Sequence, residues 1–233
     1  MKKVKPPAAR QALPRSFPMA HDLLPRLFQA DLYRFYGSVI VPVLTALQPH
    51  ENAVEDGQFT SMDDFLDNAE KVTSNLVAYE ARRCFALTLA AIFERQLQRW
   101  AHSHGIPGDG FHELLGAIAV ALTLDLEAES VGQTLKELHL LGNAVRHGEG
   151  DSADKLRKFV PNLWPPLGEA PPLRLGEKAG RLRLSERIEV SNNHLLRYVR
   201  ALTRFWGLAD REPGALVEPP LFPLDAWPRP DFP

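Results

Sequence analysis

The chain has 233 residues, 45% of them hydrophobic, which is enough to bury a sizeable core in one large domain or two small ones. The formal net charge of −2 gives no overall attraction to nucleic acid or to an anionic membrane, so a polyanion site would require a local basic cluster. The single cysteine excludes an intrachain disulfide and a multi-cysteine metal site. The sequence contains no leader-like or membrane-spanning apolar run, so we expect a cytoplasmic protein without membrane contact.

The N-terminal part divides into an arm and the start of a helical domain. Residues 1–20 contain four prolines and few clustered apolar side chains, so we expect a disordered or extended arm. From 21 to 47, apolar residues recur at helical spacing, but Pro25 and Pro42 predict breaks or kinks. We expect a single helical domain over residues 21–210.

The longest periodic stretch, residues 69–104, contains no proline and predicts a helix that forms the spine of the domain. Ser61 is a suitable N-cap for a helix that leads into this stretch. Arg82 and Arg83 lie off the apolar stripe and are expected on a solvated face, whereas Cys84 lies on the stripe and is expected in the core.

The C-terminal half contains helices, a proline-rich insertion and a tail. Helices are predicted over residues 111–122 and directly after Ser191, which is a good N-cap. Prolines crowd the first part of an insertion near residues 160–190, and the alternating pattern of residues 173–190 is compatible with a small β-hairpin. The tail, residues 211–233, holds seven prolines and is expected to lie over the bundle or over a partner protomer.

Polar residues with chemical potential gather on the helix predicted within residues 135–152. His139, Asn143 and His147 follow one another at intervals of four residues, so their side chains share one flank of the helix. Arg146 lies three residues beyond Asn143 and therefore close to this flank. The flank carries two imidazoles, an amide and a guanidinium, all groups that can act on an anionic substrate.

This helix, together with the long helix before it, resembles the HEPN superfamily of small α-helical domains. The resemblance rests on the segments Phe93–Trp100 and Gly142–Gly148 and covers about residues 62–206. It implies an all-α helical bundle of HEPN type that commonly forms a homodimer. Many members are metal-independent endoribonucleases of toxin–antitoxin, abortive-infection and other defence systems. The resemblance thus implies an RNA substrate, an antitoxin or other protein partner, and no cofactor or metal ion.

The catalytic motif of the family is matched in part. Its pattern is an arginine, usually followed by a polar residue such as asparagine, with a histidine a few positions later. Asn143 and His147 match the polar residue and the histidine, but Gly142 stands in place of the arginine. Arg146 is a displaced substitute, about 100° round the helix from His147.

Cleavage of RNA without a metal ion requires a base for the 2′-hydroxyl proton, an acid for the leaving oxygen, and positive charge at the phosphate. His147 is the candidate catalytic group because an imidazole titrates near neutral pH. Asn143 would orient the phosphate or the imidazole, and Arg146 would supply charge. His139 is a candidate for substrate binding and for a second proton carrier, and two copies of His147 could meet across a dimer axis.

Each of these residues also has a structural explanation. His147 and Arg146 close a helix, where positive side chains favour the negative end of the helix dipole. Asn143 is compatible with a buried amide that joins two helices, and His139 with a hydrogen-bonded core histidine. Three further histidines lack the spacing of a zinc site: His102, His104 and His112.

The sequence therefore leads to two hypotheses of different classes. The first is a metal-independent endoribonuclease or RNA-binding effector, and the second is a catalytically inactive HEPN-like module that acts through dimerisation or partner binding. Gly142 favours the second hypothesis. A site that grips RNA should bring arginines such as Arg82, Arg83 or Arg157 to His147, whereas a scaffold should leave that flank buried or neutral.

Overall fold

The computed structural model describes residues 22–47, 50, 53, 59–165, 183 and 185–222. Within these residues the chain is mostly helical and contains no β-strand, which confirms the all-α prediction. The α-helices are α1 (Leu24–Phe35), α2 (Val41–Ala46), α3 (Met62–Ser103), α4 (Phe111–Ala121), α5 (Gly132–His147), α6 (Asp151–Phe159) and α7 (Asn192–Ala209). The shorter elements are the π-helical segment η1 (Tyr36–Ile40) and the 3-10 turns η2 (Pro161–Leu163) and η4 (Ser185–Arg187).

The two N-terminal prolines mark helix starts. Pro25 and Pro42 lie in the first turns of α1 and α2, where the absent N–H of proline costs little. Between them η1 continues the helix as a wider turn, which accommodates a proline ring that would otherwise clash with the carbonyl four residues earlier. The expected break at Pro42 is therefore a change of helix type, and α1, η1 and α2 follow one another directly.

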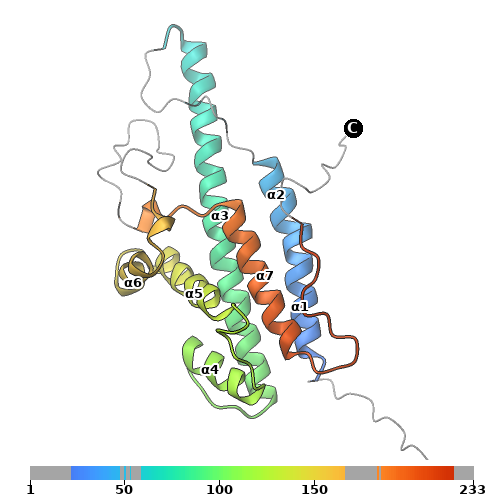
Figure 1. Ribbon diagram of the computed structural model, residues 1–233. Coiled ribbons are helices and arrows are strands. Elements are labelled where there is room, and N and C mark those ends of the chain that lie inside the picture. Colours follow the sequence, from blue (N-terminus) through green and yellow to red (C-terminus); the bar gives the residue numbers. More distant parts are fainter. Residues whose placement is uncertain are drawn as a thin grey trace, which may run out of the picture.

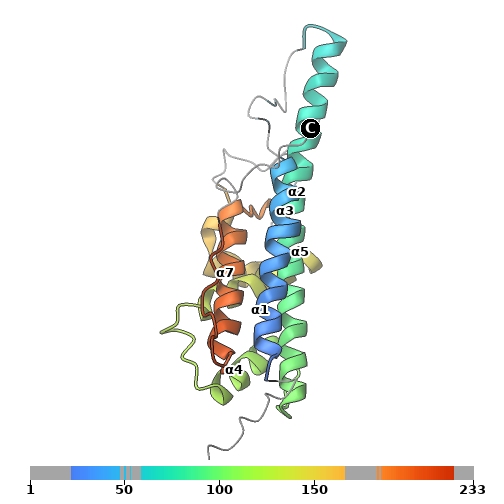
Figure 2. The same ribbon diagram turned by 90° about the vertical axis from the view of Figure 1, so that its right-hand side faces the viewer.

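Helix α3 is the spine of the molecule, as the sequence predicts. The hydroxyl of Ser61 caps it by accepting a hydrogen bond from the backbone N–H of Asp64 at 3.1 Å. Helices α1, α4, α5 and α7 pack against α3, and its N-terminal part projects past the other labelled helices (Figures 1 and 2). The packed part of α3 thus offers different faces to different neighbours.

Two expectations for α3 are wrong. Arg83 is buried, with 7% of its surface exposed, and it donates a hydrogen bond to the carbonyl of Ser185 at 3.0 Å. Cys84, expected in the core, is exposed. The segment around η4 covers the helix face that carries Arg83, so the buried face at this point is not the one that the apolar stripe indicates.

Aromatic side chains from α3 and α7 join at the centre of the core. The ring of Phe93 meets those of Phe205 and Trp206 edge-on, with centroids 5.3 Å and 5.9 Å apart. The indole N–H of Trp206 donates to the side-chain oxygen of Gln96 at 2.8 Å, so the buried polar atom of the tryptophan is satisfied. Helix α7 begins at Ser191, whose hydroxyl accepts from the backbone N–H of His194 in a capping box.

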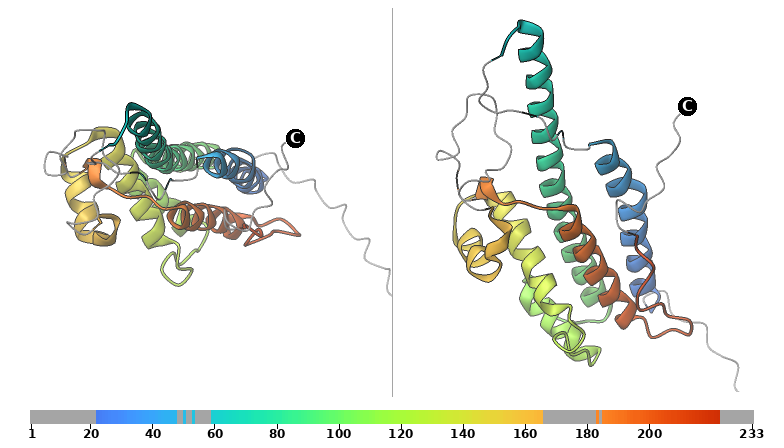
Figure 3. Two further views of the ribbon diagram at one scale, coloured as in Figure 1. Left: turned by 90° about the horizontal axis from the view of Figure 1, so that it is seen from above. Right: turned by 45° about the horizontal axis from the view of Figure 1, so that its top comes forward.

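The first part of the C-terminal tail lies along α1 and α7 (Figure 3). Side chains of the first helices hold its main chain, since Gln29 donates to the carbonyl of Leu216 at 2.6 Å and Tyr36 to that of Phe222 at 3.0 Å. The tail therefore covers its own bundle up to Phe222. The last residues, 223–233, lie outside the described part of the chain.

Other predicted segments fall wholly or partly outside the described residues. These are the N-terminal arm, residues 1–20, and most of the proline-rich insertion with its hairpin. At the described end of that hairpin, residues 185–187 form the turn η4 and residues 188–190 have no regular structure. Among the described helices, none combines the length and apolar character that a membrane span needs.

Candidate functional site

A chain of three polar side chains joins α3 to α5. The imidazole Nδ1 of His139 lies 2.9 Å from the carboxylate Oε1 of Glu94, and its Nε2 lies 3.1 Å from the amide Nδ2 of Asn143. Because a carboxylate only accepts, Nδ1 carries the proton and donates it to Glu94. Nε2 then accepts from the amide of Asn143, so both neighbours define one tautomer and one ring orientation.

The start of α4 completes the surroundings of His139. The ring of Phe111 stacks on the imidazole with centroids 4.1 Å apart and planes 8° apart. The imidazole of His112 stands nearly perpendicular to it at 5.2 Å between centroids. The side chain of His139 is 15% exposed, whereas His112 is exposed to solvent. We call Glu94, Phe111, His112, His139 and Asn143 together the His139 cluster.

The carboxylate of the cluster is held in its charged form. The hydrogen bond from His139 lowers the pKa of Glu94, and the positive charges of Arg146 and Arg95 lower it further, while burial opposes the shift. Arg146, which the sequence offered as a substitute for the arginine of the HEPN motif, thus acts electrostatically on the carboxylate of Glu94.

The exposed imidazole of the cluster is held in its neutral form. Partial burial lowers the pKa of His112, and the imidazolium of His139, when it is protonated, and the charges of Lys136 and Lys155 lower it further. Four basic residues therefore stand close enough to the cluster to change its titration, and we call them the basic rim: Arg95, Lys136, Arg146 and Lys155.

His147 stands apart from this network. It is exposed in the last turn of α5, and no hydrogen bond or ion pair links its side chain to another residue in the described part of the chain. The amide of Asn143 contacts His139 instead of His147, although both histidines lie one turn away from it. After His147, Gly148 ends the helix with a φ of 75°, and its N–H donates to the carbonyl of Ala144.

None of the three arginines expected to converge on His147 forms a hydrogen bond with it. Two of them bind other residues, and the third lies exposed on α6. Arg82 donates to the side-chain oxygen of Asn192 at 3.0 Å. Arg83 pairs with Glu80 at 2.9 Å and is buried. Arg157 lies exposed in the last turn of α6 and makes no bond to His147. This flank therefore lacks the predicted cluster of arginines, and positive charge gathers at the basic rim.

Gly142 has a packing role that leaves no room for an arginine. A Cβ atom at this position would stand 2.7 Å from the Cβ of Ala90 on α3, well inside van der Waals contact. The position faces the spine helix and is buried. The glycine at the position where the HEPN motif has an arginine is therefore coupled to the close approach of α3 and α5.

Three members of the cluster, Glu94, Phe111 and His112, were missed by reasoning from the sequence. Glu94 is 45 residues from His139, and no local spacing connects two helices at that distance. His112 was considered only as a zinc ligand, and no group of three or more potential ligands within the described residues could hold a metal ion. His112 lies at the beginning of a helix, directly after a glycine-rich turn, and nothing in that local sequence indicates that its ring lies beside His139.

Comparison with known proteins leaves the family open. No family model, no curated protein and no solved structure matches this chain. The resemblance to the HEPN superfamily therefore rests on the residues of the two helices alone.

Proposed function

We propose that this chain is a HEPN-like RNA-binding protein that cleaves RNA without a metal ion, with the His139 cluster as its reacting centre. The observation that carries the proposal is the chain from Glu94 through His139 to Asn143, beside a second imidazole at His112 and within the basic rim. Two imidazoles a few ångströms apart, with cations around them, are the groups that metal-free phosphodiester cleavage requires.

The chemistry divides between the two histidines. His112 is exposed and its lowered pKa keeps it neutral at pH 7, so it suits the base that takes the 2′-hydroxyl proton. Glu94 holds the Nδ1 of His139, and its negative charge stabilises the imidazolium that forms when Nε2 gains a proton. For Nε2 to donate to the leaving oxygen, the amide of Asn143 must release it and turn to the phosphate.

The test is cleavage of a mixed RNA pool by the purified protein in EDTA. We expect cleavage by the wild type and a loss of about 100-fold or more in His112→Gln and in His139→Gln, because each removes a proton carrier. The matched control is His102→Gln, an exposed histidine of α3 outside the cluster, which should retain full activity. His147→Gln, tested in parallel, decides between the His139 cluster and the residue that the family motif indicates.

Two outcomes of this experiment would contradict the proposal in whole or in part. If the wild type neither cleaves nor binds RNA at high protein concentration and low salt, the proposal fails. If only His147→Gln loses cleavage, the activity stands but its centre lies at the end of α5, and Glu94→Gln should then have no effect on the rate.

A second candidate function is a catalytically inactive module that acts through dimerisation or partner binding. It is favoured by the packing of Gly142 on Ala90, which leaves no room for the arginine of the HEPN motif, and by three exposed apolar side chains in the N-terminal half of α3. Met62, Leu66 and Val77 lie on one face of the helix within about 60° of one another and are 70%, 57% and 47% exposed. Light scattering of wild type and Leu66→Glu tests it, since a dimer through this face should dissociate in the variant.

A further inference from the structure

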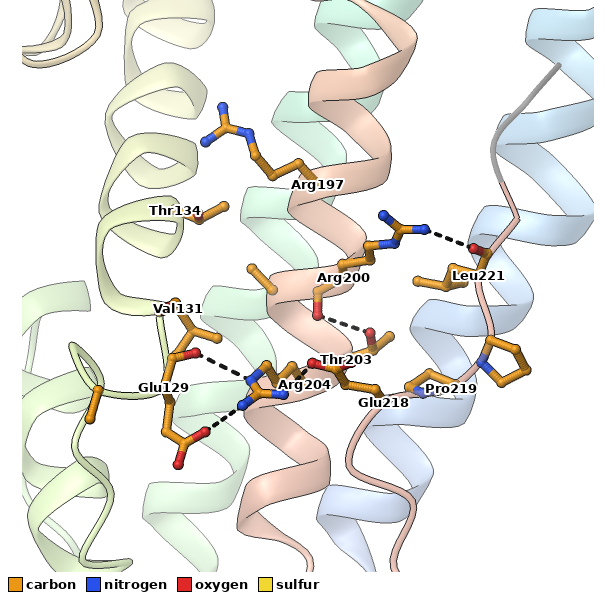
Figure 4. A pocket seen from close by; sticks show the side chains of 14 residues that line it. Glu129, Val131, Thr134, Arg197, Arg200, Thr203, Arg204, Glu218, Pro219 and Leu221 are labelled. Atoms are coloured by element: carbon orange, nitrogen blue, oxygen red, sulfur yellow. Dashed lines mark hydrogen bonds and ion pairs between the residues drawn. The ribbon is translucent and has the colours of Figure 1, made fainter. Parts of the chain in front are cut away.

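A cavity of about 660 Å³ lies between the N-terminal end of α5, one face of α7 and the tail (Figure 4). Its volume falls in the range of small-molecule sites in proteins. Three arginines from successive turns of α7 line it, and tail residues 218–221 close one side. The apolar part of the lining includes Val131, Pro219 and Leu221.

The three arginines differ in how far their charge is neutralised. Arg197 binds both oxygens of Glu137, at 2.9 Å and 2.5 Å. Arg204 pairs with Glu129 at 2.6 Å and also with Glu218 of the tail. Arg200 donates to the main-chain carbonyl of Leu221 at 3.2 Å and has no carboxylate partner among the described residues (Figure 4). Arg200 thus offers a charge and free guanidinium donors to the cavity.

The end of α5 adds a second source of positive potential. Val131 is its N-cap, no side chain caps the first turn, and that turn contains no acidic residue. The N-terminal end of a 16-residue helix carries partial positive charge on its first backbone N–H groups. The N–H of Gly132 donates to the carbonyl of Leu126 at 3.0 Å, which leaves those of Gln133 and Thr134 as donors for a ligand. Thr134, in this first turn, lines the cavity and adds a hydroxyl (Figure 4).

We propose that this cavity binds a small organic molecule that carries a phosphate group. Both Arg200 and the first turn of α5 belong to the lining and supply donors of the kind that a phosphate dianion accepts, and the apolar wall suits the organic part. The site is separate from the His139 cluster: Thr134 and His139 are five residues apart, about 140° round the helix. The proposal goes beyond the ribonuclease hypothesis and does not depend on it.

The tail regulates the affinity of this site through Glu218. The carboxylate of Glu218 forms an ion pair with Arg204, which is already paired with Glu129. Glu218 therefore places a second negative charge beside the same guanidinium. Removing that charge leaves the cavity one unit more positive and frees part of Arg204 for the ligand. Loss of Glu218 should therefore strengthen phosphate binding, whereas loss of Arg200 should weaken it.

The experiment is calorimetric titration of the full chain with adenosine 5′-monophosphate, adenosine and inorganic phosphate as probes. We expect saturable binding of the nucleotide, none of the nucleoside, and weaker binding of inorganic phosphate. Arg200→Gln should weaken nucleotide binding at least ~10-fold because a charge-assisted hydrogen bond is lost. Glu218→Gln should strengthen nucleotide binding.

Two charge-matched controls separate a site from general electrostatics. Lys71→Gln removes one positive charge from an exposed pair with Asp67 on α3, and Glu212→Gln removes one negative charge from the tail outside the cavity. Both should bind the nucleotide as the wild type does. Equal effects of Arg200→Gln and Lys71→Gln would overturn the proposal, as would the absence of saturable binding at millimolar nucleotide. Equal affinity for nucleotide and inorganic phosphate would overturn the assignment of an organic ligand.

Discussion

At the scale of single residues, position 142 shows how packing and chemistry constrain each other. Gly142 lets α5 approach α3 at Ala90, and the α5 residues of the candidate site stand beside it: His139 one turn earlier and Asn143 directly after. The close approach brings Glu94 within 2.9 Å of His139. An arginine at this position would therefore separate the helices that build the His139 cluster.

The packing role of Gly142 can be measured by substitution. We expect Gly142→Ala to lower the free energy of unfolding by about 1–3 kcal/mol, because the new Cβ stands 2.7 Å from that of Ala90. Ala90→Gly in the same chain should recover part of the loss, and urea denaturation measures both. The matched control is Gly116→Ala in α4, where no atom lies within 4 Å of the new Cβ; a loss as large there would contradict the explanation.

The lowered pKa of His112 predicts a pH dependence of stability. Below the ordinary histidine pKa of 6.5, His112 of the unfolded chain binds a proton that the folded chain resists, so the free energy of unfolding falls as the pH falls. In His112→Gln this contribution is absent. Wild type should therefore lose stability relative to the variant between pH 7.5 and pH 5.5 in urea denaturation. At pH 8 His112 is neutral in both the folded and the unfolded chain. Near that pH the free energies of unfolding of wild type and variant should therefore change with pH in the same way.

At the scale of elements, a buried carboxylate ties α5 to α7. Glu137 is 3% exposed and accepts hydrogen bonds from Arg197 and from the hydroxyl of Tyr198 at 2.6 Å. Burial raises the pKa of Tyr198, so the hydroxyl stays a donor. This contact joins α5, which carries the His139 cluster on another flank, to α7, and its Arg197 also lines the arginine-lined cavity.

Removing this carboxylate should destabilise the bundle strongly. We expect Glu137→Ala to lower the free energy of unfolding by about 2–4 kcal/mol, since it leaves buried donors without a partner. Tyr198→Phe removes one hydrogen bond and should cost about 1 kcal/mol, which makes it the comparison. Thermal denaturation of both variants measures the difference, and equal costs would show that the charge pair with Arg197 contributes nothing.

At the scale of the whole molecule, the tail completes the surface of α1 and α7. Its main chain passes so close to α7 that a Cβ on Gly207 would stand 2.5 Å from the carbonyl oxygen of Val217 and 2.7 Å from that of Leu216. The amide of Gln29, which holds the tail, would be 2.6 Å away. Glycine is therefore required at this point of the helix by the tail and not by the helix itself.

Gly207→Ala should detach the tail and leave the helices folded. We expect faster hydrogen exchange and proteolysis within residues 211–222, with far-UV circular dichroism unchanged. Because the tail supplies Glu218 to the arginine-lined cavity, the same variant should also alter nucleotide binding there. Unchanged exchange in this segment would show that the tail shifts to accommodate the methyl group.

The sequence by itself determined the helices and much of their order. Apolar periodicity, the N-caps Ser61 and Ser191 and the prolines act within a turn or two, so they can be recognised without the rest of the chain. Only the tertiary structure decided which side chains contact one another across the bundle. The burial of Arg83 by the segment around η4 and the link between Glu94 and His139 across 45 residues depend on segments that folding brings together. No local pattern contains that information, because burial and hydrogen bonding at a side chain depend on whichever distant segment packs against it.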